Sequence, residues 1–237
     1  DPALEALATA PPGSVFKAAR PSLGVALAGD GWAATTVSAT MIVAASAGIR
    51  VFATGGIGGV HRGAFGVAAT LDVSSDLEEL ARTPVAVVCA GPKAILDLPL
   101  TLEYLETRGV PVVAIGQDEV PGFYSISSGV AAPHVAADIR AVARIVTTHL
   151  DLGLGSGLLL CTPVPAEAAL SRSVAREAIE RATTEATAGG IHGPALTPWL
   201  LARIGVLTDG GSIRANTALI EHNARVAGQL AVVLAQG

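Results

Sequence analysis

One stretch, residues 51–97, constrains the fold of this 237-residue chain more than any other. It begins within an apolar run at residues 50–53, and a second apolar run follows at residues 84–90, both typical of buried strands. A glycine turn at residues 55–59 and a short segment of helical character lie between them. Strand, turn, helix and strand in this order predict parallel strands joined by a right-handed crossover. The carboxyl ends of such strands commonly gather functional groups.

The rest of the sequence continues this alternation, without a repeat, a linker or a second-domain break. We expect further strands at residues 23–28, 110–115 and 158–161, and helices at residues 1–10, 34–47, 76–81, 94–107, 136–150, 167–187, 198–204 and 212–235. Apolar residues make up 51% of the chain but aromatic residues only 3%. Ala, Val, Leu and Ile must therefore fill the core, as in a buried parallel sheet. The sequence predicts one α/β domain over residues 1–237, a three-layer α/β/α fold with a mostly parallel sheet flanked by helices on both faces.

Charge and cysteine content narrow the expected partners and surroundings. The net charge is −5, and no basic run interleaved with aromatic residues indicates a nucleic-acid partner. No apolar stretch is long and uncharged enough to span a bilayer, and no signal peptide is visible, so we expect a cytoplasmic protein without a membrane partner. Cys89 and Cys161 each lie in an apolar run, which favours buried thiols over a disulfide or a catalytic role. High hydrophobicity with little charge also indicates an oligomer.

Lys93 follows the second strand and the turn Gly91-Pro92, and an apolar segment comes after it. Two interpretations of this lysine stand side by side. A surface lysine would lay its stem along apolar groups and extend its ammonium into water. A nucleophilic lysine would need a partly neutral amine near neutral pH, so its pKa would have to fall through burial or a nearby cation. Lys17 is a candidate for that second positive charge.

A cluster of acidic and hydroxyl side chains separates the glycine turn from the second strand. Asp72 precedes an expected helix, Ser74 or Ser75 is placed to cap it, and Asp76 lies in its first turn. Helix capping alone would explain this composition. The alternative is a site where hydroxyls and helix N–H groups hold a phosphate or sugar hydroxyls. A carboxylate there would also be available to a hard divalent cation.

The glycine turn lacks a dinucleotide-binding fingerprint, because His61 occupies the position of the third glycine. A plain tight turn would account for the glycines. Thr54, His61 and Arg62 flank the turn, so the alternative is an anion cradle with a phosphate contact from Thr54 or His61. Arg62 is equally suited to a structural ion pair.

Four motifs together resemble one known family. The segments ATGGIGGVHRGA, DVSSDL, VCAGPKAILD and TLEYLETRGVP occur in this order, and they look like the pseudouridine-5'-phosphate glycosidase family. This family includes C-glycosidases, C-glycosynthases and indigoidine synthase A-like proteins, and the resemblance extends from about Lys17 to the C-terminus. Its members break or make a carbon–carbon glycosidic bond at C1 of ribose 5-phosphate. The resemblance implies the same chemistry for this chain.

The resemblance also implies roles for particular residues. Lys93 matches the family lysine that attacks C1 of the ring-opened sugar and forms a Schiff base. The other catalytic positions fall on Lys17 and Asn216, the metal position, usually occupied by Mn²⁺, on Asp72, and the substrate-binding positions on Val37, Thr54, His61, Ser74, Ser75 and Asp76. Ser75 replaces an alanine that is usual in the family. The family further implies a homotrimer that acts on ribose 5-phosphate and a carbon acceptor.

The sequence departs from the family pattern near the expected site. The family has a segment before the position of Lys17, with an H-G-x-P-x-P-like motif and a glutamate that serves as acid and base. This sequence has no such segment, and Glu5 lies in a different context. Either the native protein has residues that this sequence lacks, or the proton is handled differently. Residues 65–70 also replace a shorter polar piece, and Gly211 stands where a lysine is usual.

These departures leave three functions open. The first choice is cleavage of pseudouridine 5'-phosphate by water to uracil and ribose 5-phosphate, a reversible reaction. The second is a C-glycosynthase that joins ribose 5-phosphate to an aromatic natural product in secondary metabolism. The third belongs to another class, a catalytically inactive protein that binds sugar phosphates, and the missing glutamate motivates it.

Overall fold

The computed structural model describes residues 1–11, 13–65 and 69–236, and its centre is a five-stranded sheet. In spatial order the strands are β3 (Val51–Ala53), β5 (Ala86–Cys89), β9 (Leu158–Cys161), β7 (Val112–Ile115) and β8 (His134–Ala136). Each neighbouring pair in this order runs parallel. The strands consist mainly of Val, Leu and Ala, so both faces of the sheet are apolar and must be covered. The expected parallel sheet is confirmed.

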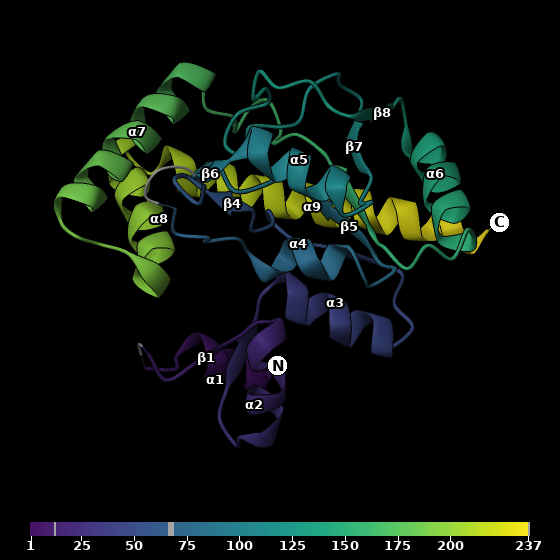
Figure 1. Cartoon of the computed structure of the whole chain (residues 1–237), viewed down its shortest axis with the longest axis horizontal. Helices are drawn as coiled ribbons and strands as arrows, with labels where there is room; N and C mark the ends of the chain where they lie inside the picture. The colour runs from purple at the N-terminus through teal and green to yellow at the C-terminus, as the bar shows by residue number, and fades with distance from the viewer. Residues whose placement is uncertain (12, 66–68, 237) are drawn as a thin grey trace.

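Helices cover both faces of the sheet and make three layers (Figure 1). The helices of one face are α3 (Val37–Ser46), α4 (Ser75–Leu80) and α5 (Leu98–Thr107), and those of the other face are α6 (Ile139–Asp151) and α9 (Gly211–Ala235). Successive strand residues point to opposite faces. Val87 therefore shares an apolar cluster with Leu80 of α4, while its neighbour Val88 shares another with Leu230 of α9. The expected three-layer α/β/α fold is confirmed.

A third apolar cluster lies beyond the carboxyl ends of the strands. It joins Phe123 and Tyr124 to α7 (Arg172–Ala188), α8 (Leu196–Leu207) and the first turns of α9. A short 3-10 helix, η2 (Gly193–Ala195), precedes α8. In Figure 1, α7 and α8 stand side by side at one end of the sheet. These helices form a wall beside the strand ends.

Residues 1–11 and 13–36 form a small lobe that projects from the rest of the molecule, called the N-terminal lobe below (Figure 1). It consists of α1 (Pro2–Ala8), β1 (Phe16–Ala18), the 3-10 helix η1 (Arg20–Ser22), α2 (Leu23–Ala28) and β2 (Ala33–Thr35). β1 and β2 pair in parallel as a two-stranded sheet of their own. A further pair, antiparallel, joins β4 (Val60–His61) to β6 (Leu96–Asp97) beside the glycine turn.

The strand expected at residues 23–28 is wrong, because this segment is α2. Its residues are apolar enough for either structure, but Ala and Leu favour a helix. A buried strand would need apolar cover on both faces, whereas Leu23 is the one buried residue of α2. The sequence pattern alone does not reveal that the segment lies on a projecting lobe.

Several helices begin later than expected, because capping side chains set their first residue. The Asp97 carboxylate accepts a hydrogen bond from the Leu100 N–H at 3.0 Å, so the helix expected from residue 94 begins at Leu98. Asp138 and Ser171 cap α6 and α7 in the same way, which moves the starts expected at residues 136 and 167. The helix expected from residue 34 begins after β2.

Two further expectations concern segments rather than elements. The stretch 65–70, which departs from the family pattern, includes residues 66–68, and these lie outside the described residues. Across the part of the chain that the structure describes, we find no helix with the length and apolar character needed to cross a bilayer.

Candidate active site

Gly56, Gly58 and Gly59 in the turn at residues 55–59 pack so closely against their neighbours that a side chain at these positions would not fit. A Cβ on Gly56 would lie 2.4 Å from a ring carbon of Phe123. A Cβ on Gly58 would lie 2.2 Å from the Oγ of Ser74, the residue that caps α4. Close approach to the start of α4 and to the loop after β7 therefore explains these glycines, and it brings backbone N–H groups of the turn to the edge of the sheet.

The Asp76 carboxylate ties this turn to two helices. Asp76 is only 4% exposed, in the first turn of α4, where its own N–H donates to the Ser74 Oγ at 3.2 Å. Its Oδ2 accepts a hydrogen bond from the Gly58 N–H and its Oδ1 accepts one from the Ser38 N–H, both at 2.8 Å. Ser38 lies in the first turn of α3. One carboxylate thus fixes the turn, α3 and α4 relative to one another, and the expected serine cap of α4 is Ser74.

Asn223 of α9 holds the other side of the turn, a role that the sequence analysis missed. Its fully buried side chain donates from Nδ2 to the carbonyls of Thr54 at 2.8 Å and Gly55 at 3.2 Å. Its Oδ1 has no hydrogen-bond partner among the described residues. Asn223 lies seven positions after Asn216, on the same face of a helix. That spacing was the available signal for a second functional asparagine.

Lys93 is fastened to the glycine turn through its backbone. Gly91, two residues after the end of β5, adopts a left-handed conformation (φ +85°) and redirects the chain there. The Lys93 N–H donates to the Ile57 carbonyl at 3.0 Å, and the Ile57 N–H donates to the Gly91 carbonyl at 3.2 Å. The lysine and the turn therefore form one hydrogen-bonded unit at the carboxyl ends of β3 and β5.

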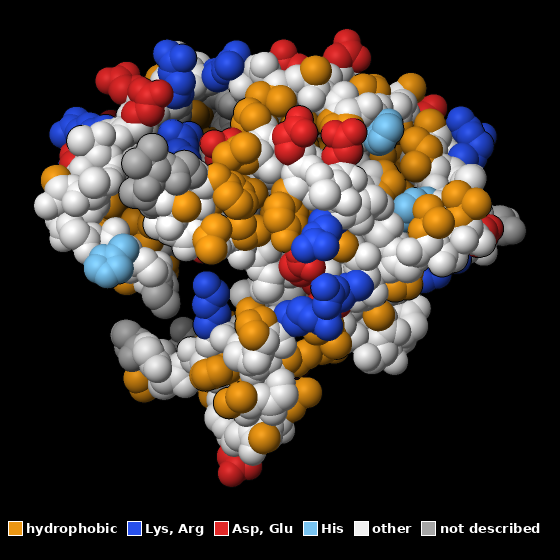
Figure 2. All heavy atoms as spheres, viewed as in Figure 1, with side chains coloured by type: hydrophobic (Ala, Val, Ile, Leu, Met, Phe, Trp, Pro, Cys, Tyr) orange, Lys and Arg blue, Asp and Glu red, His pale blue; other side chains and the backbone are white. Residues whose placement is uncertain are grey.

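A cavity of about 540 Å³ lies at this unit and brings together most of the residues predicted for the site. Those that line it are Lys17, Val37, Thr54, His61, Ser74, Asp76, Lys93 and Asn216. They come from the N-terminal lobe, the sheet edge, α3, α4 and α9, elements far apart in the sequence. The space-filling view shows an indentation between the N-terminal lobe and the region of α8 (Figure 2).

Two predicted residues, Ser75 and Asp72, lie beside the cavity and not in its wall. The Ser75 Oγ lies 3.1 Å from the Ser38 Oγ, so this hydroxyl belongs to the network that joins α4 to α3. The Asp72 side chain is 48% exposed, and its Oδ2 lies 3.8 Å from the Nδ1 of His61. Asp72 therefore lies next to His61, which lines the cavity.

Lys93 lies partly buried in the cavity wall, and this environment changes the pKa of its amine. Burial lowers the pKa of Lys93 below its usual value, because an ammonium loses water contacts there. The Asp76 carboxylate opposes this change in pKa, and the positive charge of Lys17 adds to it. The direction is the one that a nucleophilic lysine requires, and Lys17 contributes as expected.

Part of the cavity wall is apolar. Its members are Ile95, Leu96, Phe123, Tyr124, Leu201, Ile213 and Ile220. Ile213 and Ile220 of α9 are 62% and 45% exposed, at the same cavity as Lys93. Apolar side chains that gather at a concave site indicate a surface for an apolar part of a ligand. Burial raises the pKa of Tyr124 to about 12, so its hydroxyl stays protonated.

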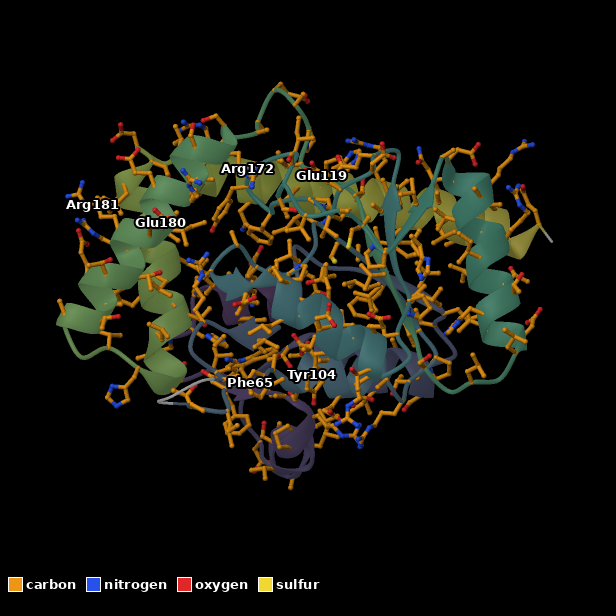
Figure 3. All side chains as sticks on the ribbon, turned by 45° about the horizontal axis from the view of Figure 1, so that its top comes forward. Phe65, Tyr104, Glu119, Arg172, Glu180 and Arg181 are labelled. Carbon is orange, nitrogen blue, oxygen red and sulfur yellow. The ribbon has the colours of Figure 1, made fainter. Side chains whose placement is uncertain are left out.

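The loop after β7 carries Phe123 and Tyr124 into this wall. Their rings meet edge to face, with centroids 4.8 Å apart and planes at 78°. Phe123 adopts a φ of +64°, a backbone conformation that costs energy for any residue other than glycine. Strained residues of this kind cluster at functional sites. The Glu119 carboxylate holds the loop by accepting hydrogen bonds from the Ser127 hydroxyl and a backbone N–H, and Arg172 lies close to it (Figure 3). The hydrogen bond from Ser127 is the largest cause that lowers the pKa of Glu119.

Asp72 offers a metal ion one carboxylate. Among residues 1–11, 13–65 and 69–236, no three or more His, Cys, Asp or Glu side chains are grouped to hold a metal ion. A single half-exposed carboxylate suits a hard divalent cation that keeps most of its water ligands. The donor set at Asp72 therefore fits Mn²⁺ in this hydrated form.

The fold and this cavity define an α/β protein with a polar and apolar pocket at the carboxyl edge of a parallel sheet. A family profile described as "Indigoidine synthase A like protein" matches residues 1–233. The chain belongs to this family, which confirms the resemblance seen in the sequence motifs.

Proteins named pseudouridine-5'-phosphate glycosidase are similar to nearly the whole chain. The one from Caldanaerobacter subterraneus subsp. tengcongensis is 54% identical over 220 residues, which are 93% of this chain and 71% of the relative. The one from Paracoccus denitrificans is 52% identical over 233 residues, which are 98% of this chain and 76% of the relative.

Two solved structures share the fold. The prealnumycin C-glycosynthase AlnA in complex with ribulose 5-phosphate has a TM-score of 0.91 at 36% identity, covering 100% of this chain and 76% of its own. An indigoidine synthase A-like protein from Thermotoga maritima has a TM-score of 0.83 at 34% identity, covering 93% of this chain and 71% of its own. The match to AlnA includes the N-terminal lobe, which is therefore part of the shared fold.

Proposed function

We propose that this protein makes or breaks the carbon–carbon bond between C1 of ribose 5-phosphate and a carbon acceptor, in the first place as a pseudouridine-5'-phosphate glycosidase. The observation that carries the proposal is Lys93, a partly buried amine of lowered pKa in the cavity that gathers the family's substrate positions. Relatives with that name, more than half identical over almost the whole chain, support the choice of substrate. On this proposal, pseudouridine 5'-phosphate and water give uracil and ribose 5-phosphate reversibly.

Lys93 supplies the covalent step. In the direction of synthesis, its neutral amine adds to the C1 aldehyde of the ring-opened sugar and loses water to form an imine. The acceptor carbon donates an electron pair to C1, the C=N pair returns to the lysine nitrogen, and the proton of the acceptor carbon ends on that nitrogen. The sugar hydroxyl then forms the C1–O bond as the C1–N bond breaks, and its proton passes to the nitrogen, which leaves as the free Lys93 amine. Cleavage runs these steps in reverse.

The polar side of the cavity binds the sugar phosphate in this proposal. Thr54, His61 and Ser74 line it next to the backbone of the glycine turn, where hydroxyls and N–H groups suit phosphate oxygens. Val37 and Asn216 line the same cavity as Lys93, so on this proposal they contact the sugar. Asp76 acts through the Gly58 N–H that it holds, and Ser75 acts through the same network.

We further propose that Asp72 holds a divalent cation, Mn²⁺ in the first place. When bound, the ion would supply positive charge beside the phosphate. Asp72→Asn removes the charged ligand and should weaken Mn²⁺ binding at least tenfold in an electron paramagnetic resonance titration. Glu5→Gln, in the N-terminal lobe, is the matched control, and equal Mn²⁺ affinity of the two variants would remove the metal site from the proposal.

Reductive trapping tests the proposed function. Borohydride added to the protein with ribose 5-phosphate should reduce the imine to a stable amine and attach the sugar to Lys93, as found by peptide mass spectrometry. Lys93→Arg keeps the positive charge and should form no adduct. An adduct on another lysine, or none in the wild type, would refute the mechanism.

A C-glycosynthase acting on an aromatic acceptor is the second candidate, because of the apolar wall around Ile213 and Ile220. The similarity to AlnA, named as a C-glycosynthase, supports it as well. Turnover with ribose 5-phosphate and either uracil or a polycyclic phenol separates the two candidates. Product formation with the phenol alone would replace the first choice.

We include a homotrimer and a cytoplasmic location in the proposal. The family resemblance supports the trimer, and two buried free cysteines agree with a reducing compartment. Sedimentation equilibrium should give three times the mass of one chain. A concentration-independent monomer would contradict the trimer.

A further inference from the structure

We propose that Arg20 is a positioning residue for this reaction, because its pairing with the buried Glu79 fixes Lys17 in the cavity beside Lys93. The inference rests on the proposed function in one respect: it takes Lys93 as the reacting amine. It adds a residue that touches neither the cavity nor, on this proposal, the substrate.

Lys17 reaches the cavity from an element outside the central sheet. It lies in β1, opposite Ala34 of β2, in the two-stranded sheet of the N-terminal lobe. Lys17 is exposed to solvent, and it lines the same cavity as Lys93. The distance between the two amines therefore depends on how the lobe is held against the sheet domain.

Arg20 provides such a hold three residues after Lys17. Its guanidinium pairs with the Glu79 carboxylate of α4. The Glu79 side chain is 1% exposed and the Arg20 side chain 38%. In the described part of the chain, Arg20 is the one basic group paired with Glu79, and the Thr83 hydroxyl donates the other hydrogen bond. A buried carboxylate is costly without its cationic partner, so this pair fastens η1 to α4.

The backbone of Arg20 is joined to the cavity network as well. The Arg20 N–H donates to the Ser38 Oγ at 3.0 Å. Ser38 in turn contacts the Ser75 hydroxyl at 3.1 Å, and its own N–H donates to Asp76. Arg20 thus ties the lobe, through its side chain and its backbone, to both α3 and α4. Among the residues that the structure describes, Thr35 and Thr36 of the lobe add hydrogen bonds to α3 but none to α4.

Among the charged groups near Lys93, Lys17 belongs to the N-terminal lobe, so its position depends on how the lobe is held. The titratable and charged groups that share a cavity with Lys93 are Lys17, His61, Asp76 and Tyr124, and, in a neighbouring cavity that Lys93 also lines, Arg62, Asp97, Arg172 and Arg176. After burial, Asp76 and Lys17 change the pKa of Lys93 most, in opposite directions. Asp76 is fixed by its own backbone hydrogen bonds. Loosening the lobe should therefore weaken the Lys17 contribution alone.

Competitive labelling of amines with acetic anhydride across a pH series measures this directly. The midpoint pH for acetylation of Lys93, read by peptide mass spectrometry, requires no sugar. Lys17→Gln removes a positive charge that lowers the pKa of Lys93, so it should raise this midpoint by up to about one pH unit. Arg20→Gln should also raise the midpoint. The double variant should show no further rise, since Arg20 acts through Lys17. Arg20→Lys, which keeps the charge, should shift the midpoint less.

Arg82→Gln is the matched control. Arg82, just beyond the end of α4, pairs with Glu78 of α4 at 2.9 Å and does not join that helix to the lobe, so the Lys93 midpoint should stay at the wild-type value. If Arg20→Gln lowers thermal stability and leaves the midpoint unchanged, Arg20 is a structural residue only and the proposal is overturned.

A second variant covers the risk that Arg20→Gln fails to fold with an unpaired buried carboxylate. Arg20→Ala combined with Glu79→Gln removes the pair without leaving that charge, and its midpoint should also rise. An unchanged midpoint in this folded variant overturns the proposal. Absence of a ribose 5-phosphate adduct in the wild type would count against the proposed function alone, because the labelling midpoint reports the placement of Lys17 independently.

Discussion

At the scale of single residues, one buried amide keeps the glycine turn in place. Asn223→Leu has nearly the same shape but leaves the carbonyls of Thr54 and Gly55 without their donor. We expect the free energy of unfolding to fall by about 1–3 kcal/mol, and ribose 5-phosphate to bind more weakly. Urea unfolding and titration calorimetry measure the two effects.

Asn216→Leu is the matched control for that prediction. Asn216 lines the cavity from the same helix and is not fully buried. Its replacement should change stability by less than about 0.5 kcal/mol while lowering activity. Equal losses of stability in the two variants would mean that Asn223 is no more important to the turn than Asn216.

Gly58 tests how tightly the turn is packed. In Gly58→Ala the new methyl group would meet the Ser74 side chain and disturb the N–H that Asp76 holds. Overpacking of this kind costs about 1–3 kcal/mol, so we expect a lower melting temperature together with weaker sugar-phosphate binding. Gly24→Ala in α2, where a Cβ meets open space, should melt no lower than the wild type.

The two cysteines should be chemically silent in the folded protein. Cys89 and Cys161 lie opposite each other in β5 and β9 and are fully buried, as the sequence predicted. A hydrogen bond with Cys89 and then burial raise the pKa of Cys161, which disfavours the reactive thiolate. Ellman's reagent should react with neither thiol in buffer and with both in urea. Fast reaction in buffer would contradict their burial.

At the scale of elements, one ion pair links α7 to α8 and makes their contact depend on pH. Hydrogen bonds from Arg203 and then Arg181 lower the pKa of Glu185 from 4.5 to about 2. A lowered folded-state pKa contributes stability above the unfolded value, and this contribution is lost as pH falls from about 4.5 toward about 2. Arg203→Gln should therefore be less stable than the wild type at neutral pH. The difference should be small, because the pair is partly exposed, and should shrink in acid; urea unfolding at both pH values measures it.

The elements also show how far sequence reasoning reaches. Apolar runs and turn residues located β3, β5, β7 and β9, because a buried parallel strand needs such a run wherever it lies. The apolar run at residues 23–28 was wrongly predicted as a strand, because the sequence does not show that this segment lies on a projecting lobe, where most of its side chains stay outside the core.

The site divides in the same way. Motifs with a known chemical role predicted the residues that meet in the cavity, including Lys93 and Asp76. The supporting contacts could not be predicted, because Arg20 meets Glu79 and Asn223 meets the glycine turn only after distant segments pack. Nothing in the sequence around Arg20 distinguishes it from a surface arginine, and the spacing of Asn223 from Asn216 indicates a shared helix face but not the carbonyls that Asn223 meets.

At the scale of the whole molecule, the residues that line the cavity come from three parts: the N-terminal lobe, the edge of the sheet, and helices α8 and α9. Figure 1 shows where these elements lie. A ligand that touches all three should stabilise each of them by mass action. Ribose 5-phosphate should slow amide hydrogen exchange in β1 and in the first turns of α9. α6, on the far side of the sheet from α4 and α5, serves as the internal control. Protection confined to the glycine turn would mean that the lobe does not take part in binding.

Because backbone hydrogen bonds join Lys93 to the glycine turn, the part of the cavity proposed for bond formation and sugar-phosphate binding is distinct from the part proposed for acceptor binding. The amine proposed to react and the turn proposed to hold the phosphate belong to one hydrogen-bonded piece of backbone. The side chains of Leu201, Ile213 and Ile220 project into the cavity from α8 and α9 and are not part of that backbone. Laboratory evolution could therefore randomise these three positions to admit new ring systems while the bond-forming apparatus is left untouched.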